Sequence, residues 1–270
     1  MRPFYVHHDG PRAHLLPLRP LLRQALAHGL PLSLGVCRGD EALFADFATA
    51  GLEVVVGPLA NMPRGAPFGL AACCPPGHAP LPLRWGHDFD PAAFSWEGAV
   101  KAFHRGLRRH GCQVTIADPE GPVPMFDLGA DLPAPRLPRP GIYLDLERSL
   151  DPRCWFVCDL PRLAAVLPDH DVYCTRVPAG APANVFDVAD LGWPARAALA
   201  NACDVLVGTT FDPFALVLTE ANRDKPKALC GHDPRVTPPF WDYPGNALEL
   251  LPGMDDLVDF LLANVAEVTA

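Results

Sequence analysis

The stretch CDVLVGTTFDPFALVLTEANRDKPKALCG, residues 203–231, decides the fold class, because a helix-forming segment lies between two apolar strands. CDVLVG is short and apolar, which is typical of a buried strand, and KPKALCG has the same character. Between them, PFALVLTEANRD is expected to form a helix with Asp212 as its N-cap and Pro213 in the first helical position. A strand–helix–strand order predicts a parallel sheet with a crossover helix.

The same alternation runs through the rest of the chain. Helical patterns in the first half end at Gly29, Gly51 and Gly111, the residue type preferred just after a helix. The expected strands cover residues 3–8, 31–37, 52–57, 112–118, 141–146, 171–177, 203–208 and 225–231. The expected helices cover residues 14–29, 39–51, 95–111, 153–167, 193–202, 213–224 and 254–268. Residues 68–74 are a further candidate strand, and 183–190 a short extended piece.

A proline-rich segment separates two groups of these elements. Residues 129–140 have no apolar periodicity and indicate a linker. We therefore predict an α/β protein of two Rossmann-like βα domains, residues 1–138 and 139–270, that face a cleft. Ligands bind at the carboxyl ends of strands in open parallel sheets, so the cleft is the expected site.

Composition excludes several classes of protein. The 270 residues are 49% hydrophobic, which is ample for packed cores, and the net charge is −9. That charge argues against nucleic acid as a partner, since no basic face stands out. No apolar run reaches the ~18 residues that a membrane span needs, and the N-terminus does not resemble a signal peptide. The nine cysteines lack the spacing of a disulfide scaffold or zinc site, which favours buried thiols in a cytoplasmic protein.

Two acids mark the helix expected after residue 212. On a continuous helix, Glu220 would lie near the same face as Asp212. The helix N-terminus offers free N–H groups to a phosphate, and carboxylates accept hydrogen bonds from sugar hydroxyls. A nucleotide-sugar diphosphate would suit this arrangement. The alternative is a capped, half-buried helix with a solvated glutamate.

The stretch LANACDVLVGTTFDPFALVLTEANRDKPKALCG resembles the C-terminal signature of GT-B glycosyltransferases, especially retaining family 4. In that family two glutamates are separated by seven residues, with Gly-Phe-Gly after the first and Gly-Lys-Pro before the next strand. This chain has Asp212, seven residues, Glu220 and then Lys225–Pro226. The resemblance covers residues 141–268, whereas residues 1–128 are similar to GT-B proteins, including the heptosyltransferase type, only in the order of their elements.

The resemblance implies roles for individual residues. Glu220 would bind the nucleotide ribose and Asp212 the donor sugar, and the amides of Phe214 and Ala215 would face the diphosphate. The family also places an arginine and a lysine after the first strand of the C-terminal domain, where they neutralise the leaving diphosphate. The basic residues at that place are Arg148 and Arg153, and no lysine matches.

The loop after the first strand carries the candidate acid–base groups His7, His8, Asp9 and His14. Inverting GT-B enzymes place a base in this loop to take the proton of the acceptor hydroxyl, so His8, Asp9 and His14 are the catalytic candidates. One or two of these residues could instead cap the following helix. His87, Asp88 and Asp90 also resemble a set of metal ligands, but Asp90–Pro91 is expected to cap the next helix, and we expect neither a metal site nor a cofactor.

The leading hypothesis is a glycosyltransferase that moves a sugar from a nucleotide-sugar donor to an acceptor. One alternative is a nucleotide-sugar hydrolase or epimerase that uses His7, His8 or Asp9. Another is a GT-B-like protein that binds a partner without catalysis. The sequence leaves open the sugar, the base, the acceptor, the stereochemical outcome and the oligomeric state.

Overall fold

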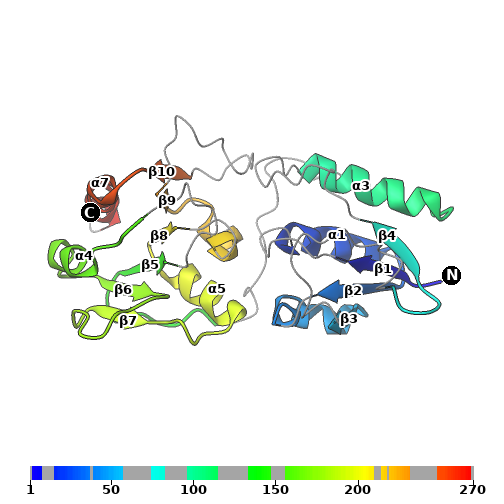
Figure 1. Cartoon of the computed structure of the whole chain (residues 1–270), viewed down its shortest axis with the longest axis horizontal. Coiled ribbons are helices and arrows are strands. Elements are labelled where there is room, and N and C mark those ends of the chain that lie inside the picture. Colours follow the sequence, from blue (N-terminus) through cyan, green and yellow to red (C-terminus); the bar gives the residue numbers. More distant parts are fainter. Residues whose placement is uncertain are drawn as a thin grey trace. The chain divides into compact units, whose positions relative to one another are not determined.

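The computed structural model describes residues 2–7, 15–36, 39–56, 74–82, 96–114, 133–146, 156–209, 214–217, 219–231 and 248–268. The chain divides into two compact units (Figure 1). Unit 1 comprises residues 1–124 and 240–242, and unit 2 comprises residues 125–239 and 243–270. Each unit has its own parallel sheet, so the predicted α/β class with two βα units is confirmed. The boundary between residues 138 and 139 stays a prediction, as does a cleft between the units.

The sheet of unit 1 has the order β3-β2-β1-β4, with every pair parallel. Its strands are β1 (Phe4–His7), β2 (Leu32–Val36), β3 (Glu53–Val56) and β4 (Ala79–Pro82). Strand β4 was not predicted, because the prolines at 80 and 82 made this segment look like a loop. It lies at the sheet edge among the described strands and pairs with β1, and an edge is where prolines are tolerated.

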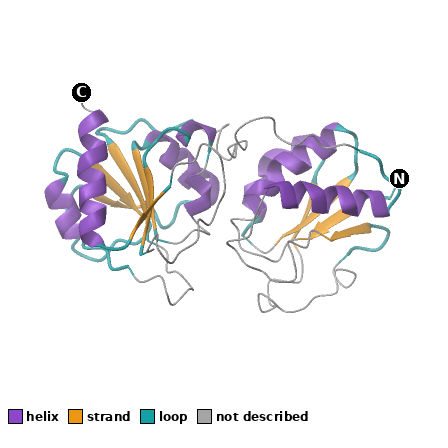
Figure 2. Ribbon diagram, turned by 90° about the horizontal axis from the view of Figure 1, so that it is seen from above, coloured by secondary structure: helices purple, strands orange, loops and turns teal. Residues whose placement is uncertain are grey.

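The helical segments of unit 1 are α1 (Leu15–Ala27), η2 (Glu41–Ala50) and α3 (Trp96–Arg109). Figure 2 shows α1 and α3 on the same face of the sheet, and the two helices touch. Gly29, at a φ of 72°, closes α1 by donating its N–H to Leu26 O over 2.8 Å. The expected helix at 39–51 is a 3₁₀ helix interrupted at Phe44, and it ends at Gly51 as predicted.

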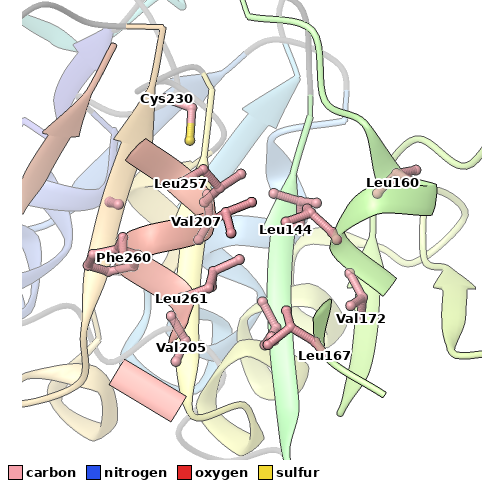
Figure 3. Close-up of a cluster of buried hydrophobic side chains, with 14 of the residues drawn as sticks. Leu144, Leu160, Leu167, Val172, Val205, Val207, Cys230, Leu257, Phe260 and Leu261 are labelled. Atoms are coloured by element: carbon pink, nitrogen blue, oxygen red, sulfur yellow. The ribbon is translucent and has the colours of Figure 1, made fainter. Parts of the chain in front are cut away.

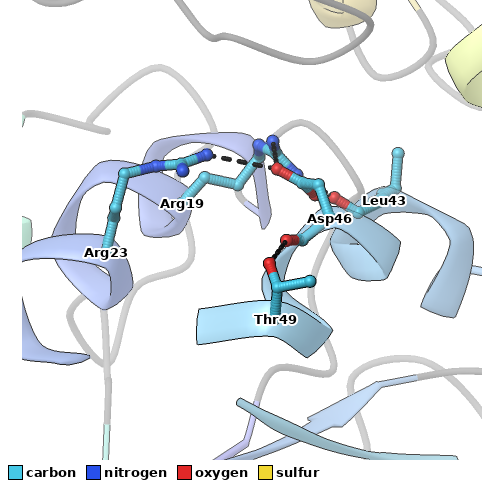
Figure 4. A network of polar contacts seen from close by, with 5 residues as sticks. All are labelled: Arg19, Arg23, Leu43, Asp46 and Thr49. Atoms are coloured by element: carbon cyan, nitrogen blue, oxygen red, sulfur yellow. Dashed lines mark hydrogen bonds and ion pairs between the residues drawn. The ribbon is translucent and has the colours of Figure 1, made fainter. Parts of the chain in front are cut away.

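A buried guanidinium joins α1 to η2 (Figure 4). Arg19 is 1% exposed and donates to both carboxylate oxygens of Asp46, over 3.0 and 2.7 Å, and to the carbonyl oxygen of Leu43. Its guanidinium lies 4.9 Å from the ring centroid of Phe47. Arg23 donates to the same carboxylate over 3.1 Å from an exposed position. The carboxylate of Asp46 therefore compensates the buried positive charge of Arg19, which would otherwise destabilise the fold.

The sheet of unit 2 has the order β10-β9-β8-β5-β6-β7, again with every pair parallel. Its strands are β5 (Gly141–Asp145), β6 (Asp171–Cys174), β7 (Val185–Asp187), β8 (Val205–Gly208), β9 (Lys227–Cys230) and β10 (Glu249–Leu251). Strand β10 was not predicted. Its three residues are too few to show a period of two.

Helices cover both faces of this sheet (Figure 2). Helices α4 (Leu160–Val166) and α7 (Met254–Val268) lie on one face, and α5 (Trp193–Ala202) lies on the other. The core between α4, α7 and the sheet is apolar (Figure 3). Leu257 and Leu261 of α7 meet Val205 and Val207 of β8 there. A sheet buried on both faces explains why these strands read as continuous apolar runs.

Two predicted helices are shorter than expected. The helix predicted at 153–167 begins only at Leu160, where Asp159 caps it by accepting from Arg162 N over 3.0 Å; residues 156–159 are not helical. The helix predicted at 213–224 consists of the 3₁₀ turns η5 (Ala215–Val217) and η6 (Glu220–Asn222), with Thr219 extended. The continuous helix on which Asp212 and Glu220 would share a face is therefore interrupted at Thr219, and Asp212 itself lies outside the described residues. Of the predicted strand at 112–118, residues 112–114 do not belong to a strand and residues 115–118 lie outside the described residues. The candidate strand at 68–74 also lies almost wholly outside them.

Replacing Asp46 tests the buried ion pair of unit 1. We expect Asp46→Ala to lower the free energy of unfolding by about 3 kcal/mol, because it leaves Arg19 buried without its carboxylate. Arg23→Ala removes only the exposed partner and should cost less than about 1 kcal/mol. Urea denaturation followed by circular dichroism measures both. Equal losses in the two variants would contradict this account.

Candidate functional site

The strand order of unit 2 places a topological switch point between β5 and β8. From β5 the chain moves outward through β6 to β7, and it then returns to the other side through β8, β9 and β10. Asp145 and Gly208 end the two central strands and lie opposite each other in the register. In open parallel sheets, ligands bind outside the carboxyl ends of the strands at such a point. This edge is therefore the candidate binding site of unit 2.

A buried carboxylate lies at this point. Asp145 is fully buried. Its Oδ1 accepts from Thr175 Oγ1 over 3.2 Å, and its Oδ2 accepts from Tyr143 Oη over 3.4 Å. Its carbonyl oxygen accepts from the backbone N–H and the hydroxyl of Thr209, over 2.9 and 3.2 Å. Because Thr175 directly follows β6 and Thr209 directly follows β8, Asp145 joins the ends of β5, β6 and β8.

Burial also fixes the protonation of the adjacent phenol. The pKa of Tyr143 is raised well above its ordinary value, first by burial and then by the negative charge of Asp145, while Arg196 opposes the shift. A neutral phenol keeps its proton for donation to the carboxylate. Tyr143 therefore acts as a hydrogen-bond donor to Asp145.

The chain after β8 is held by a close contact between a glycine and a ring. Phe214 is fully buried, and a Cβ atom added at Gly208 would lie 2.5 Å from its Cγ. Only glycine leaves room for this ring at the end of β8. The side chain of Phe214 thus holds the backbone that enters η5.

Glu220 begins η6 and points its carboxylate to solvent. Its side chain is 63% exposed and pairs with Arg223, whose Nε and Nη2 donate over 3.0 and 2.7 Å to its two oxygens. A carboxylate has about four acceptor sites, so this fork leaves capacity for the hydroxyls of a ligand. Arg223 therefore orients the carboxylate of Glu220 but leaves some of its acceptor sites available.

Amides and a hydroxyl brace this turn against the end of α5. Asn201 Oδ1 accepts from Thr219 Oγ1 over 2.5 Å and from Asn222 Nδ2 over 3.0 Å. Lys225 Nζ donates to the carbonyl oxygen of Asn201 over 2.7 Å. The residues on both sides of Glu220 are therefore fixed to α5, which holds the backbone that carries its carboxylate.

Lys227 closes the turn from inside the protein. It is 1% exposed, and its Nζ donates to the carbonyl oxygens of Asn222, Arg223 and Lys225 over 2.5, 2.9 and 2.8 Å. An ammonium group has three N–H donors, so each meets one carbonyl. Burial lowers the pKa of Lys227 to about 8, and the nearby Asp224 opposes the shift.

The predicted site residues divide into two groups. His8, Asp9, His14, Arg148, Arg153 and Asp212 lie outside the described residues. Phe214, Ala215 and Glu220 are described; Phe214 and Ala215 follow the switch point in the chain, and Glu220 lies in the braced turn. Their roles in binding a nucleotide sugar stay predictions. Among the described residues there is no group of three or more His, Cys, Asp or Glu side chains that could hold a metal ion.

Sequence reasoning missed Asp145, Thr175 and Lys227. One signal was present for Asp145, because an acid that ends the apolar strand GIYLD must find donors when the strand is buried. Thr175 and Lys227 gave no comparable signal, since threonine and lysine are ordinary residues at strand ends.

Comparison with known proteins identifies the fold. No protein-family model and no curated protein matches the chain in sequence. It is similar in structure to the Escherichia coli heptosyltransferase WaaC with ADP-2-deoxy-2-fluoro heptose, at a TM-score of 0.60 and 13% identity over 98% of this chain and 99% of that one. The glycosyl transferase family 9 structure from Veillonella parvula gives a TM-score of 0.52 at 10% identity, covering 97% of this chain and 88% of that one.

Two further structures extend the comparison. The Escherichia coli ADP-heptose lps heptosyltransferase II gives a TM-score of 0.51 at 13% identity over 99% of this chain and 100% of that one. The chain covers only 56% of the iron-containing dodecameric glycosyltransferase TibC from enterotoxigenic Escherichia coli, with a TM-score of 0.47 and 16% identity over 81% of this chain. The likenesses to WaaC, to the family 9 structure and to heptosyltransferase II show that the chain has a GT-B-like fold.

The depressed pKa of Lys227 predicts a pH dependence of stability. Between pH 8 and about 10.5 the unfolded chain keeps this proton while the folded chain releases it, so the contribution of Lys227 to stability rises with pH in this window. We expect the stability of wild type relative to Lys227→Met to increase by about 2 kcal/mol from pH 8 to pH 10. Urea denaturation at each pH measures it, with Lys101→Met, at an exposed lysine, as the control. A difference independent of pH would contradict the prediction.

Proposed function

We propose that the chain is a glycosyltransferase that moves a sugar from a nucleotide-sugar donor to an acceptor. The observation that carries the proposal is the match over almost the full length of both chains to the WaaC structure. A shared fold alone leaves the activity open. Two features of this chain support the proposal. One is the hydrogen-bonded carboxylate of Asp145 at the topological switch point, and the other is the exposed carboxylate of Glu220 on a turn held by hydrogen bonds.

The donor would be bound by unit 2. Glu220 would accept hydrogen bonds from the ribose hydroxyls, with Arg223 holding the carboxylate in position. The diphosphate would lie at the backbone amides that follow β8, including those of Phe214 and Ala215, near Asp212. Arg148 and Arg153 are the proposed cations beside the diphosphate, because negative charge grows there as the bond to the sugar breaks.

The transfer step exchanges one bond at the anomeric carbon for another. The bond between this carbon and the diphosphate oxygen breaks, and the nucleoside diphosphate leaves with the electron pair. The acceptor hydroxyl oxygen bonds to the same carbon and gives its proton to a base. His8, Asp9 and His14 of unit 1 are the proposed bases, since imidazole and carboxylate groups suit that task at neutral pH.

Loss of Glu220 tests the donor site. We expect Glu220→Ala to weaken binding of ADP, the nucleotide in a WaaC structure, by about 1–3 kcal/mol, because ribose hydroxyls lose their acceptor. Isothermal titration calorimetry measures the affinity. Asp224→Ala removes a neighbouring exposed carboxylate and should leave it unchanged. If UDP or GDP binds and ADP does not, the same comparison applies to that nucleotide. Unchanged affinity in folded Glu220→Ala would remove Glu220 from the site.

Turnover separates the three hypotheses. We expect the protein to release a nucleoside diphosphate slowly from one nucleotide sugar and faster when the acceptor is added, with the sugar appearing on the acceptor by mass spectrometry. Release with only free sugar as the second product would indicate a hydrolase. Nucleotide-sugar binding in a thermal-shift screen, without release under any condition, would indicate a binding protein. Asp9→Asn and His8→Ala should lower transfer more than donor binding.

A further inference from the structure

Lysine is an uncommon residue in a buried strand such as β9. Lys227 is 1% exposed, and the rest of β9, residues 228–230, is fully buried and uncharged. Removal of an ammonium group from water destabilises its charged form, and this is why burial lowers the pKa of Lys227. A methionine would fill a similar volume without that cost. Stability does not by itself account for a lysine at this position.

The ammonium group of Lys227 closes the turn that follows η6. Its three N–H groups donate to the carbonyl oxygens of Asn222, Arg223 and Lys225, over 2.5, 2.9 and 2.8 Å. The first two of these carbonyls end a short 3₁₀ turn, where no further helical turn offers them donors. Lys227 therefore supplies, from the buried side, the donors that a longer helix would have provided.

The backbone of this turn carries the ion pair of Glu220 and Arg223. Arg223 donates its backbone N–H to the carbonyl oxygen of Glu220 over 3.2 Å, and its guanidinium donates to the carboxylate of the same residue. An exposed pair of long side chains contributes little by itself, because holding both in one geometry costs entropy. The pair keeps one geometry when the backbone beneath it is fixed. Lys227 binds the carbonyl oxygen of Arg223 and so fixes that backbone directly.

We propose that Lys227 is a positioning residue for donor binding, whose ammonium group fixes the turn so that the carboxylate of Glu220 is held ready for the ribose hydroxyls. This inference rests on the proposed function, since it concerns the affinity of the same site. Lys227 is buried and acts through Arg223 and Glu220. Its ammonium group is the essential feature, because neither a neutral amine nor an apolar side chain can donate to all three carbonyl oxygens.

Deprotonation of Lys227 should loosen the turn. Burial lowers the pKa of Lys227 to about 8; Asp224 opposes the shift and Lys225 adds to it. In the adjoining elements, β8 and the last turn of α5 contain no titratable residue. Glu249 of β10 pairs with Ala228, whose side chain lies on the other face of β9. Above its pKa the amine has only two N–H groups, so one carbonyl loses its donor, while the neutral side chain is easier to bury and the fold is retained.

The pH dependence of ADP binding tests the proposal. We expect the Kd of wild type for ADP, or for UDP or GDP if one of these binds instead, to rise about three- to tenfold from pH 7 to pH 9.5, because the turn loses one hydrogen bond. Lys227→Met should bind more weakly at pH 7 and show no such rise. Lys101→Met, at an exposed lysine of α3, should follow wild type. Isothermal titration calorimetry measures each affinity.

Chemical rescue separates the ammonium group from the volume of the side chain. Lys227→Ala lacks three carbon atoms and the ammonium group, which are the atoms of propylammonium. We expect propylammonium to restore the affinity of this variant about threefold or more, and tetramethylammonium, a cation without an N–H group, to restore none. Hydrogen exchange of residues 219–225, measured without nucleotide by mass spectrometry, should be faster in Lys227→Ala and slow again with propylammonium. Circular dichroism verifies folding.

The outcomes distinguish this inference from the proposed function. Failure of wild type to bind any nucleoside diphosphate would overturn the donor assignment and this inference with it. Binding by wild type that Lys227→Met and Lys227→Ala leave unchanged would overturn the inference alone. No rescue in folded Lys227→Ala, or equal rescue by tetramethylammonium, would assign Lys227 a packing role and overturn it too. If both variants fail to fold, the wild-type profile decides, and a Kd independent of pH overturns the inference.

Discussion

The hydrogen bonds of Asp145 are the constraint on which unit 2 depends. A fully buried carboxylate destabilises a fold unless donors reach it, and here Thr175 and Tyr143 supply them from β6 and from β5 itself. Thr209, which follows β8, donates to the carbonyl oxygen of Asp145 through its backbone N–H and its hydroxyl. The three strand ends are thereby fixed where the strand order reverses. These buried hydrogen bonds therefore hold the strand ends in place before any ligand arrives at this edge.

A second set of hydrogen bonds holds the turn that carries Glu220. Lys227 supplies three donors to backbone carbonyls, and Asn201 accepts from the side chains of Thr219 and Asn222. In the described part of the crossover between β8 and β9, two short 3₁₀ turns take the place of one continuous helical ladder. Side-chain hydrogen bonds replace that ladder. Such bracing suits a binding residue, because a preorganised group loses less entropy when a ligand arrives.

The two units differ in what their buried and exposed charges do. In unit 1, the buried Arg19 ties α1 to η2, whereas the arginines of α3 face solvent on the opposite side of their helix from Phe103 and Leu107. In unit 2, the buried charges Asp145 and Lys227 organise strand ends and a turn. The proposed binding of the donor by unit 2 is consistent with this contrast, because the buried charges of unit 2 lie at strand ends and at the turn that carries Glu220.

The sequence by itself determined the α/β class, most strands and the glycine-terminated helices, because alternating apolar periods and Gly29, Gly51 and Gly111 are local signals. It did not reveal the break in the helix predicted at 213–224. Only the tertiary structure decided that break, since packing of Phe214 on Gly208 and the hydrogen bonds of Lys227 outweigh helix propensity. The polar partners of Asp145 also required the fold. They depend on which residues the fold brings to one edge of the sheet, and local sequence does not fix that.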